Sequence, residues 1–260
     1  MTIYTFDGTF GGLLTAVFDA FERHEEPDEL LTAGDALPLF CNEVYEVVSD
    51  PTRAERVFAG LEKRLSREAL RIVTVSWQSE LPELNSPLFR YICKVFRQPK
   101  SMVERNFADP DVLEVTNIAR RVSYEAHRIM QFVRFQKAKD GTYLGVVAPE
   151  HDVLPMVTHH FADRFNDQPW LLFDARRHYG YYYYEGKGDP LRITFEDEAS
   201  IPFSLADGRL NDDLLSDDDH LLQDLWRTYF KAICIRERLN PRKQRADMPV
   251  RFWRYMTEMQ

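Results

Sequence analysis

The hydrophobic pattern of this chain changes its period near residue 142, and this change limits the folds open to it. Before that point, apolar residues such as Phe10, Leu14 and Val17 recur every three or four positions, as on one face of a helix. After it come four β-rich runs, with a helix expected at 152–165 after the first; the runs lie near 143–148, 169–175, 178–185 and 190–196. The pattern predicts an α+β protein, in which a mostly helical scaffold carries a small mixed sheet.

No internal repeat and no low-complexity linker divides the chain, so we expect one domain over residues 1–260. Its expected parts are a helical part at 1–140 and 216–260, an α/β insert at 141–197 and an acidic loop at 196–220. Within the helical part, short strands are expected at 2–6 and 43–48 and helices from about Phe10, at 111–139, from 216 to about 238 and at 249–258.

Local signals mark where several helices start. Three pairs place a capping side chain before a proline: Asp50-Pro51, Ser86-Pro87 and Asp109-Pro110. Ser216 with Asp219 three residues later resembles a capping box, although Asp replaces the usual Glu or Gln. Along the helix that follows, the apolar stripe is expected in the core; it comprises Leu222, Leu225, Tyr229 and Ile233.

Composition limits the compartment and the kinds of site. Cys41, Cys93 and Cys234 are far apart and odd in number, which favours a reducing compartment. No apolar run approaches a membrane span, and the first ten residues lack the pattern of a signal peptide. The sequence also lacks a phosphate loop, a dinucleotide fingerprint and a serine-hydrolase elbow. We therefore expect a soluble cytoplasmic protein with no membrane contact, no metal site and no cofactor.

Charge is distributed unevenly along the chain. The net charge is −9, but residues 196–220 hold nine carboxylates and one arginine, a local charge of −8. The segments 118–139 and 221–260 each carry a local charge of +5. This asymmetry permits an anion-binding face, and a solvated basic helix surface is the alternative explanation.

Glu125 is the first candidate site residue. It falls on the apolar stripe of the 111–139 helix, so we expect a buried carboxylate paired with Arg128, an environment that shifts pKa values. The adjoining helix face is rich in hydrogen-bonding groups; it carries Arg120, Tyr124, His127, Gln131 and Arg134. A structural ion pair would produce the same pattern, so both interpretations stay open.

A second group of candidates lies around the expected sheet. Adjacent His159 and His160 point about 100° apart on a helix, so they cannot ligate one metal together. His160 is instead expected in the core, facing the sheet. The strand ending at Asp174, followed by Arg177, could present site residues, and an edge ion pair is the alternative.

Arginines beside aromatic residues near the carboxy terminus suit phosphate and base contacts, although a solvated terminus would look similar. The candidate nucleic-acid contacts are Arg120, Arg128, Arg134, Arg164, Arg177, Arg227, Arg238, Arg242, Arg251 and Trp253. The candidate catalytic residues are Glu125, His127, His160 and Asp174.

The order of several motifs resembles a bacterial family of domains of unknown function. The matching motifs are Tyr4-x-Phe6-Asp7-Gly8-Thr9-Phe10-x-Gly12, Glu125-x-His127-Arg128-x-x-x-Phe132-x-Arg134-Phe135, His160-Phe161-x-x-Arg164, Trp170-x-x-x-Asp174-x-x-Arg177, Leu225-Trp226-Arg227, Glu237-Arg238-x-Asn240 and Pro249-x-Arg251-x-Trp253. Members of that family are described as DNA repair or DNA metabolism proteins. They are associated with a radical-SAM protein of DNA modification or repair, and some relatives are fused to a uracil-DNA-glycosylase-like domain.

The resemblance implies a DNA repair component that binds damaged or single-stranded nucleic acid and acts with a radical-SAM partner. The resemblance does not imply a catalytic role for any residue of this chain. The residues themselves leave two alternatives open. One is an enzyme in which Glu125, His127 and His160 perform acid–base chemistry on a nucleotide or nucleobase. The other is a protein adaptor whose acidic loop covers its own basic face or docks a partner.

Overall fold

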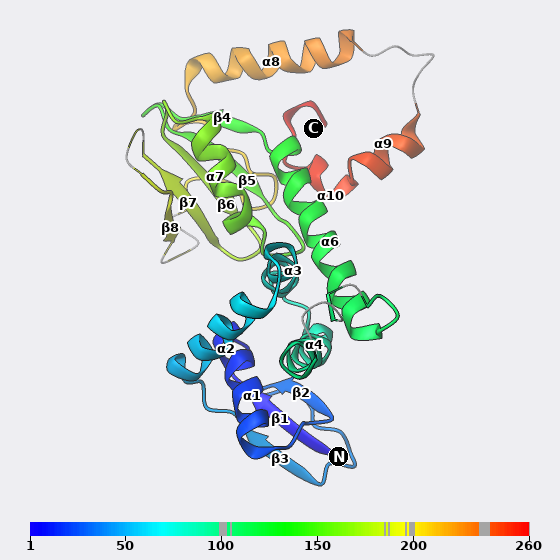
Figure 1. Cartoon of the computed structure of the whole chain (residues 1–260). Coiled ribbons are helices and arrows are strands. Elements are labelled where there is room, and N and C mark those ends of the chain that lie inside the picture. Colours follow the sequence, from blue (N-terminus) through cyan, green and yellow to red (C-terminus); the bar gives the residue numbers. More distant parts are fainter. Residues whose placement is uncertain are drawn as a thin grey trace. The chain divides into compact units, whose positions relative to one another are not determined.

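The computed structural model describes residues 1–98, 103–104, 106–184, 186, 188–195, 197, 201–233 and 240–259. The chain is an α+β protein, which confirms the prediction from its hydrophobic pattern (Figure 1). It divides into two compact units, the amino-terminal unit of residues 1–123 and the carboxy-terminal unit of residues 124–260. The expected organisation as one domain stays a prediction. Among the described residues, no helix combines the length and the apolarity needed to cross a membrane.

The amino-terminal unit contains a small parallel sheet in the order β2-β1-β3. Its strands are β1 (Thr2–Phe6), β2 (Glu29–Thr32) and β3 (Glu43–Glu46), of which β2 is missing from the sequence prediction. The helices of this unit are α1 (Phe10–Arg23), α2 (Pro51–Arg64), α3 (Arg67–Trp77), the 3-10 turn η1 (Pro82–Leu84) and α4 (Asn85–Arg97), of which α1 contacts β1 and α4 contacts β2. Asp50 caps α2 as expected, because its side chain accepts from the N–H groups of Thr52 and Arg53.

Ser86 does not start a helix, which corrects the prediction for Ser86-Pro87. Helix α4 begins one residue earlier, at Asn85, directly after η1. The Ser86 hydroxyl instead lies against β2, where it accepts a hydrogen bond from Leu30 N at 2.9 Å. A long-range contact with the sheet has therefore taken the place of the local cap.

Helix α6 (Pro110–Phe132) begins at the expected cap, where Asp109 Oδ1 accepts from Asp111 N and Val112 N. It ends seven residues before the predicted end at 139, because β4 (Phe135–Lys137) follows. In β4 the side chains alternate. Phe135 packs against Phe161 and Phe165, whereas Gln136 hydrogen-bonds the backbone of Gly208 and Leu210. A period of two therefore replaces the helical period here.

The carboxy-terminal unit is built on a five-stranded sheet in the order β4-β5-β6-β7-β8. The remaining strands are β5 (Tyr143–Val147), β6 (Trp170–Asp174), β7 (Tyr179–Tyr183) and β8 (Leu191–Thr194). Strands β5 and β6 are parallel and are joined through α7 (Leu154–Arg164), whereas the other pairs are antiparallel. All four predicted strands and the mixed character of the sheet are confirmed.

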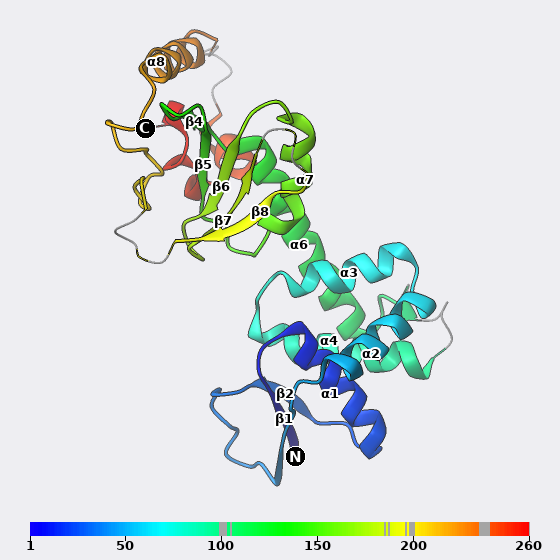
Figure 2. The same cartoon turned by 90° about the vertical axis from the view of Figure 1, so that its left-hand side faces the viewer.

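Two different layers cover the faces of this sheet (Figure 2). On one face, α7 places Phe161 against Trp170. On the other, the segment 201–216 and the carboxy terminus supply apolar side chains to one buried cluster; its members include Leu144, Val146, Leu171, Phe173, Phe203, Leu210, Leu215 and Tyr255. The expected acidic loop is therefore partly a core-forming segment, although Asp212, Asp213, Asp217 and Asp218 are exposed.

The chain ends with α8 (Asp217–Ala232), α9 (Pro241–Asp247), α10 (Val250–Trp253) and the 3-10 turn η4 (Thr257–Met259). The expected core stripe of α8 is wrong: Leu222 and Leu225 are each 56% exposed, and Tyr229 and Ile233 each 54%. The capping box at Ser216 is also wrong, because Asp219 is buried and accepts from Lys137 N of β4.

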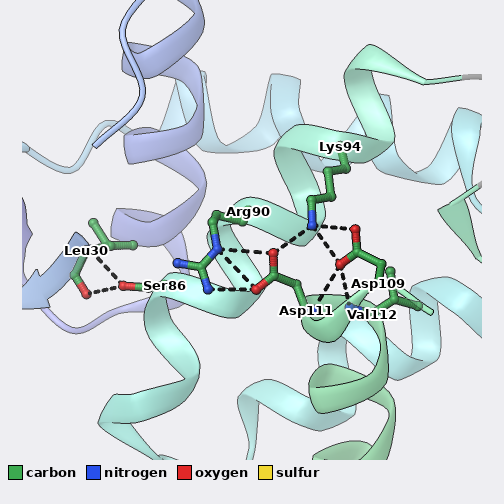
Figure 3. A network of polar contacts seen from close by, with 7 residues as sticks. All are labelled: Leu30, Ser86, Arg90, Lys94, Asp109, Asp111 and Val112. Carbon is green, nitrogen blue, oxygen red and sulfur yellow. Dashed lines mark hydrogen bonds and ion pairs between the residues drawn. The ribbon is translucent and has the colours of Figure 1, made fainter. Parts of the chain in front are cut away.

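A charged network ties α4 to the start of α6 in the amino-terminal unit (Figure 3). Lys94 Nζ lies 2.6 Å from Asp109 Oδ2 and 2.7 Å from Asp111 Oδ2. Arg90 Nη2 lies 2.6 Å from Asp111 Oδ1, and the Asp111 side chain is 7% exposed. Burial would raise the pKa of both aspartates, but the hydrogen bonds from Lys94, and for Asp111 also from Arg90, hold each pKa below its usual value.

This network is expected to make stability depend on pH below about 5. A carboxyl group whose folded-state pKa is lowered contributes stability above its unfolded pKa of about 3.9, and loses it as the pH falls through the folded-state pKa. We expect Lys94→Met to reduce the free energy of unfolding by about 2 kcal/mol at pH 7 and by less at pH 3. Urea unfolding at both pH values measures this, with the exposed Lys63→Met as the control. An equal loss at both pH values would contradict the assignment.

Candidate functional site

Glu125 lies on the buried side of α6, as predicted, but its partners differ from the expected ones. Its side chain is 2% exposed, and Arg251 Nη2 donates to Oε1 at 2.7 Å. Two backbone N–H groups also donate to the Glu125 carboxylate: Glu150 N to Oε1 at 3.0 Å and His151 N to Oε2 at 2.8 Å. The predicted pairing with Arg128 is wrong, because Arg128 Nη2 lies 3.5 Å from Ala246 O.

The segment Pro149, Glu150 and His151, here called the 149–151 loop, is held from its other side by the turn after β6. Arg177 donates to Pro149 O at 3.2 Å and to Glu150 O at 2.9 Å. Asp174, which is fully buried, accepts from Arg177 Nη1 at 2.8 Å and from two backbone N–H groups of the same turn. Burial raises the pKa of Asp174, and the hydrogen bonds of Arg177 and the backbone only partly oppose this effect.

Four predicted site residues therefore meet in one network around the 149–151 loop: Glu125, Asp174, Arg177 and Arg251. The contacts described above join a carboxylate to a guanidinium, or a charged group to the backbone. Arg251 also pairs with Glu150 at 3.0 Å. Such an arrangement fixes α6, the loop and the carboxy terminus to one another, as in the structural ion pair that the sequence left open.

The two candidate histidines lie apart from Glu125. His127 is exposed on α6, where its Nε2 lies 2.9 Å from Gln131 Nε2. His160 is exposed on α7, which corrects the expected core position, because Phe161 takes the buried position facing Trp170. Arg164 is exposed on the same helix, with its guanidinium over the Phe165 ring.

A pocket of about 600 Å³ lies between the end of α6, β4, β5 and α8. We call it the aromatic pocket; its lining residues are Gln131, Arg134, Phe135, Tyr143, Asp219, Leu222, Gln223, Trp226 and Thr257. Its size falls within the range of about 300–1,000 Å³ that is typical of ligand sites.

Arg134 is fixed at the wall of the aromatic pocket. Its Nε and Nη2 bind Glu258, at 3.0 and 2.5 Å to Oε1, and the Glu258 side chain is 1% exposed. Burial would raise the pKa of Glu258, but the Arg134 hydrogen bonds outweigh this and hold that pKa low. Nη1 donates to backbone carbonyls of Gln131 and Val133. Each guanidinium nitrogen is thus engaged, and the group lies over the Trp226 ring, 5.8 Å from its centroid.

Exposed cations lie beside the same part of α6. Arg242 and Arg245 are exposed on α9, and they are three positions apart, so they share one helix face. The contact of Arg128 with Ala246 O joins α9 to α6 one turn before Gln131 and six residues before Arg134. Lys243 is paired with Asp247 at 2.8 Å.

The remaining residues predicted to contact nucleic acid do not form one group with Arg242. Arg227 donates to Thr257 O and Asp224, and Trp253 Nε1 donates to Met248 O. Arg120 is exposed in the part of α6 that belongs to the amino-terminal unit, and Arg238 lies outside the described residues. Within the described ranges, no group of three or more His, Cys, Asp or Glu residues could hold a metal ion.

The family model of a domain of unknown function, DUF4130, matches residues 82–258, which is more than half of the chain. The chain belongs to the DUF4130 family. In this DUF4130 protein the matched segment contains the 149–151 loop, the aromatic pocket and α9, whereas the motif from Tyr4 to Gly12 lies outside it. No curated protein and no solved structure matches the chain.

Sequence reasoning identified Arg134 but missed most of the aromatic pocket. The spacing predicts a helix at Phe135 and a capping role for Asp219, and neither position is recognisable as part of a pocket from the sequence. The available signal was the alternation after Phe132, which places Phe135 on the opposite face from Gln136. No sequence signal indicated that α8 would come beside β4.

Proposed function

We propose that this DUF4130 protein is a DNA repair or DNA metabolism component that binds single-stranded or damaged DNA through its carboxy-terminal unit. The observation that carries the proposal is the row of groups along the last turns of α6. There, Arg128 contacts α9. Gln131, one turn later, and Arg134, two residues past the end of the helix, line the aromatic pocket. Cations for phosphates and aromatic rings for bases are the two parts that single-strand binding requires.

The cations of α9 are the part of the charge distribution that supports this face, since Asp219 of the acidic segment lines the aromatic pocket itself. Most of the net negative charge belongs to residues 196–220, whereas Arg242 and Arg245 are exposed on α9. Arg177 and Arg251 are engaged in the network around the 149–151 loop, so we assign them a structural role in this proposal. No catalytic role is proposed for Glu125, because Arg251 and two backbone amides already occupy its carboxylate.

Binding to a single-stranded oligonucleotide is expected to weaken steeply as salt is added, because the bound phosphates release counterions. The double variant Arg242→Gln/Arg245→Gln should bind about tenfold more weakly at 0.1 M salt. In a plot of log affinity against log salt concentration, the slope of the variant should be less steep by about 1.4, since each lost phosphate contact with a single strand contributes about 0.7 to the slope. Fluorescence anisotropy of a labelled oligonucleotide over a salt series measures both quantities.

The matched control is Arg67→Gln/Arg71→Gln, which removes two exposed arginines from α3 and changes the net charge equally. It should leave affinity and slope unchanged. Absent or salt-insensitive binding by the wild-type protein would refute the proposal. Equal losses in the two double variants would show that net charge acts without this face.

The partner in this proposal is a radical-SAM protein of DNA modification or repair. Its support is the resemblance of the motifs around Glu125, Asp174 and Arg251 to a family associated with such a protein. Co-purification of the two proteins, with DNA present and after nuclease treatment, tests the association. Capture that survives nuclease treatment supports direct contact, and capture that requires DNA supports a shared substrate. Failure of both removes the partner from the proposal.

A further inference from the structure

We infer that the aromatic pocket admits one unpaired nucleobase of the bound strand. This inference rests on the proposed function, because the strand must first be held by the cations of α9. It adds a specific chemistry: the pocket would recognise a base rather than the sugar–phosphate backbone.

The rings of the pocket suit a flat aromatic ligand. Phe135, Tyr143 and Trp226 come from β4, β5 and α8, and all three line the same pocket. Trp226 is 40% exposed, so part of its ring is open to a ligand. Bases stack on such rings whatever their sequence, because every base presents a π-face.

Arg134 supports stacking more than phosphate binding. Its nitrogens donate to Glu258 and to two backbone carbonyls, so its plane is fixed and four of its five N–H groups are used. A guanidinium held in this way offers a flat cationic face, which stacks on bases. Holding it in advance also reduces the ordering cost of binding.

Polar groups at the pocket wall suit the edge of a base. Asp219 is 5% exposed; its Oδ1 accepts from Lys137 N at 3.1 Å and its Oδ2 from Gln223 Nε2 at 2.7 Å. These contacts orient the Gln223 amide, and Gln131 supplies a second amide to the lining. The amide oxygens of Gln131 and Gln223 can still accept hydrogen bonds, which an apolar side chain of a protein partner could not donate. A base offers donors and acceptors in its own plane.

A smaller cavity of about 160 Å³ shares Phe135 and Tyr143 with the aromatic pocket. Trp170, which also lines it, is 1% exposed, and its Nε1 is buried without a hydrogen-bond partner among the described residues. An unsatisfied buried donor is uncommon in folded proteins. Trp170 does not line the aromatic pocket itself, so the inference does not depend on this donor.

The test compares two labelled oligonucleotides of equal length and charge, one with all its bases and one with abasic residues throughout. Wild-type protein should bind the intact strand about tenfold more tightly, as expected for one stacked base. Trp226→Ala should remove this preference and leave the affinity for the abasic strand unchanged. Trp226→Phe should retain most of it. The matched control is Tyr184→Ala, which removes an aromatic ring that is 52% exposed outside the pocket lining and should change neither affinity.

The outcomes separate the two ideas. If neither strand binds, the proposed function fails. If both strands bind equally well to the wild type with a steep salt dependence, the strand binding stands and the base pocket is refuted. A preference for the intact strand that survives Trp226→Ala also refutes the pocket. Thermal unfolding of each variant is measured in parallel. If Trp226→Ala does not fold, Trp226→Leu replaces it, because leucine fills part of the space without an aromatic ring and should also lose the preference for the intact strand.

Discussion

Replacing Arg177 with methionine is expected to lower the free energy of unfolding by about 4 kcal/mol, the cost typical of leaving a buried charge without its partner. The Arg177 side chain is 12% exposed and that of Asp174 is fully buried. Methionine fills a similar volume, but the Asp174 carboxylate then retains only two backbone N–H donors. The carbonyls of Pro149 and Glu150 lose a donor as well.

Chemical denaturation followed by circular dichroism measures the loss. The pKa of Asp174 is already raised by burial, and without Arg177 it should rise further. A carboxyl group with a raised folded-state pKa stabilises the fold below its unfolded pKa and loses that contribution as the pH rises through the folded-state value. The deficit of the variant should therefore shrink between pH 7 and pH 5. Arg164→Met, which removes an exposed arginine from α7, should cost less than about 0.5 kcal/mol. A deficit that does not change with pH would contradict the role of Asp174.

Glu125→Ala is expected to cost about 3 kcal/mol of stability, mainly because it removes the acceptor of two backbone amides in the 149–151 loop. Arg251 loses its buried partner but retains Glu150. The exposed Glu114, on the same helix, is the matched control, and Glu114→Ala should be nearly neutral. The same denaturation experiment measures both variants.

The losses of unfolding free energy in Arg177→Met and Glu125→Ala should not be additive. Glu125 and Arg177 hold opposite sides of one loop, so the double variant should lose at least about 0.5 kcal/mol less than the sum of the single losses. Strict additivity would show that the loop does not couple them. A loss below about 1 kcal/mol for Glu125→Ala alone would indicate that the buried carboxylate is maintained for a purpose other than stability.

Most strands of the larger sheet could be predicted because their signals are local. Strand β6 has four consecutive apolar residues before Asp174, and all five of its residues are buried. Asp50 and Asp109 were recognised as caps because a cap needs only the next three residues. In contrast, the alternation of β4 covers three residues and follows directly on the helical period of α6, and the four residues of β2 show no alternation of apolar and polar side chains.

Which residues contact each other in the folded protein could not be predicted from their spacing along the sequence. Arg128, one turn from Glu125, was the nearest cation in sequence, yet the observed partner Arg251 is 126 positions away. The apolar stripe of α8 has the period of an amphipathic helix, but a period does not say what covers the stripe. His160 has apolar neighbours in sequence, but adjacent helical residues point about 100° apart, so Phe161 faces the sheet and His160 the solvent.

A gene fragment encoding only the carboxy-terminal unit would begin inside α6, because the division between residues 123 and 124 falls within Pro110–Phe132. The remaining nine residues of the helix would lack the Asp109 cap and would be too short to hold a helix by themselves. A cut at residue 82 keeps α4 and the cap, but it uncovers Leu88, Phe89 and Ile92, buried residues of a helix that packs on α1 and β2. Recombinant work on this protein is therefore best done with the uncut polypeptide.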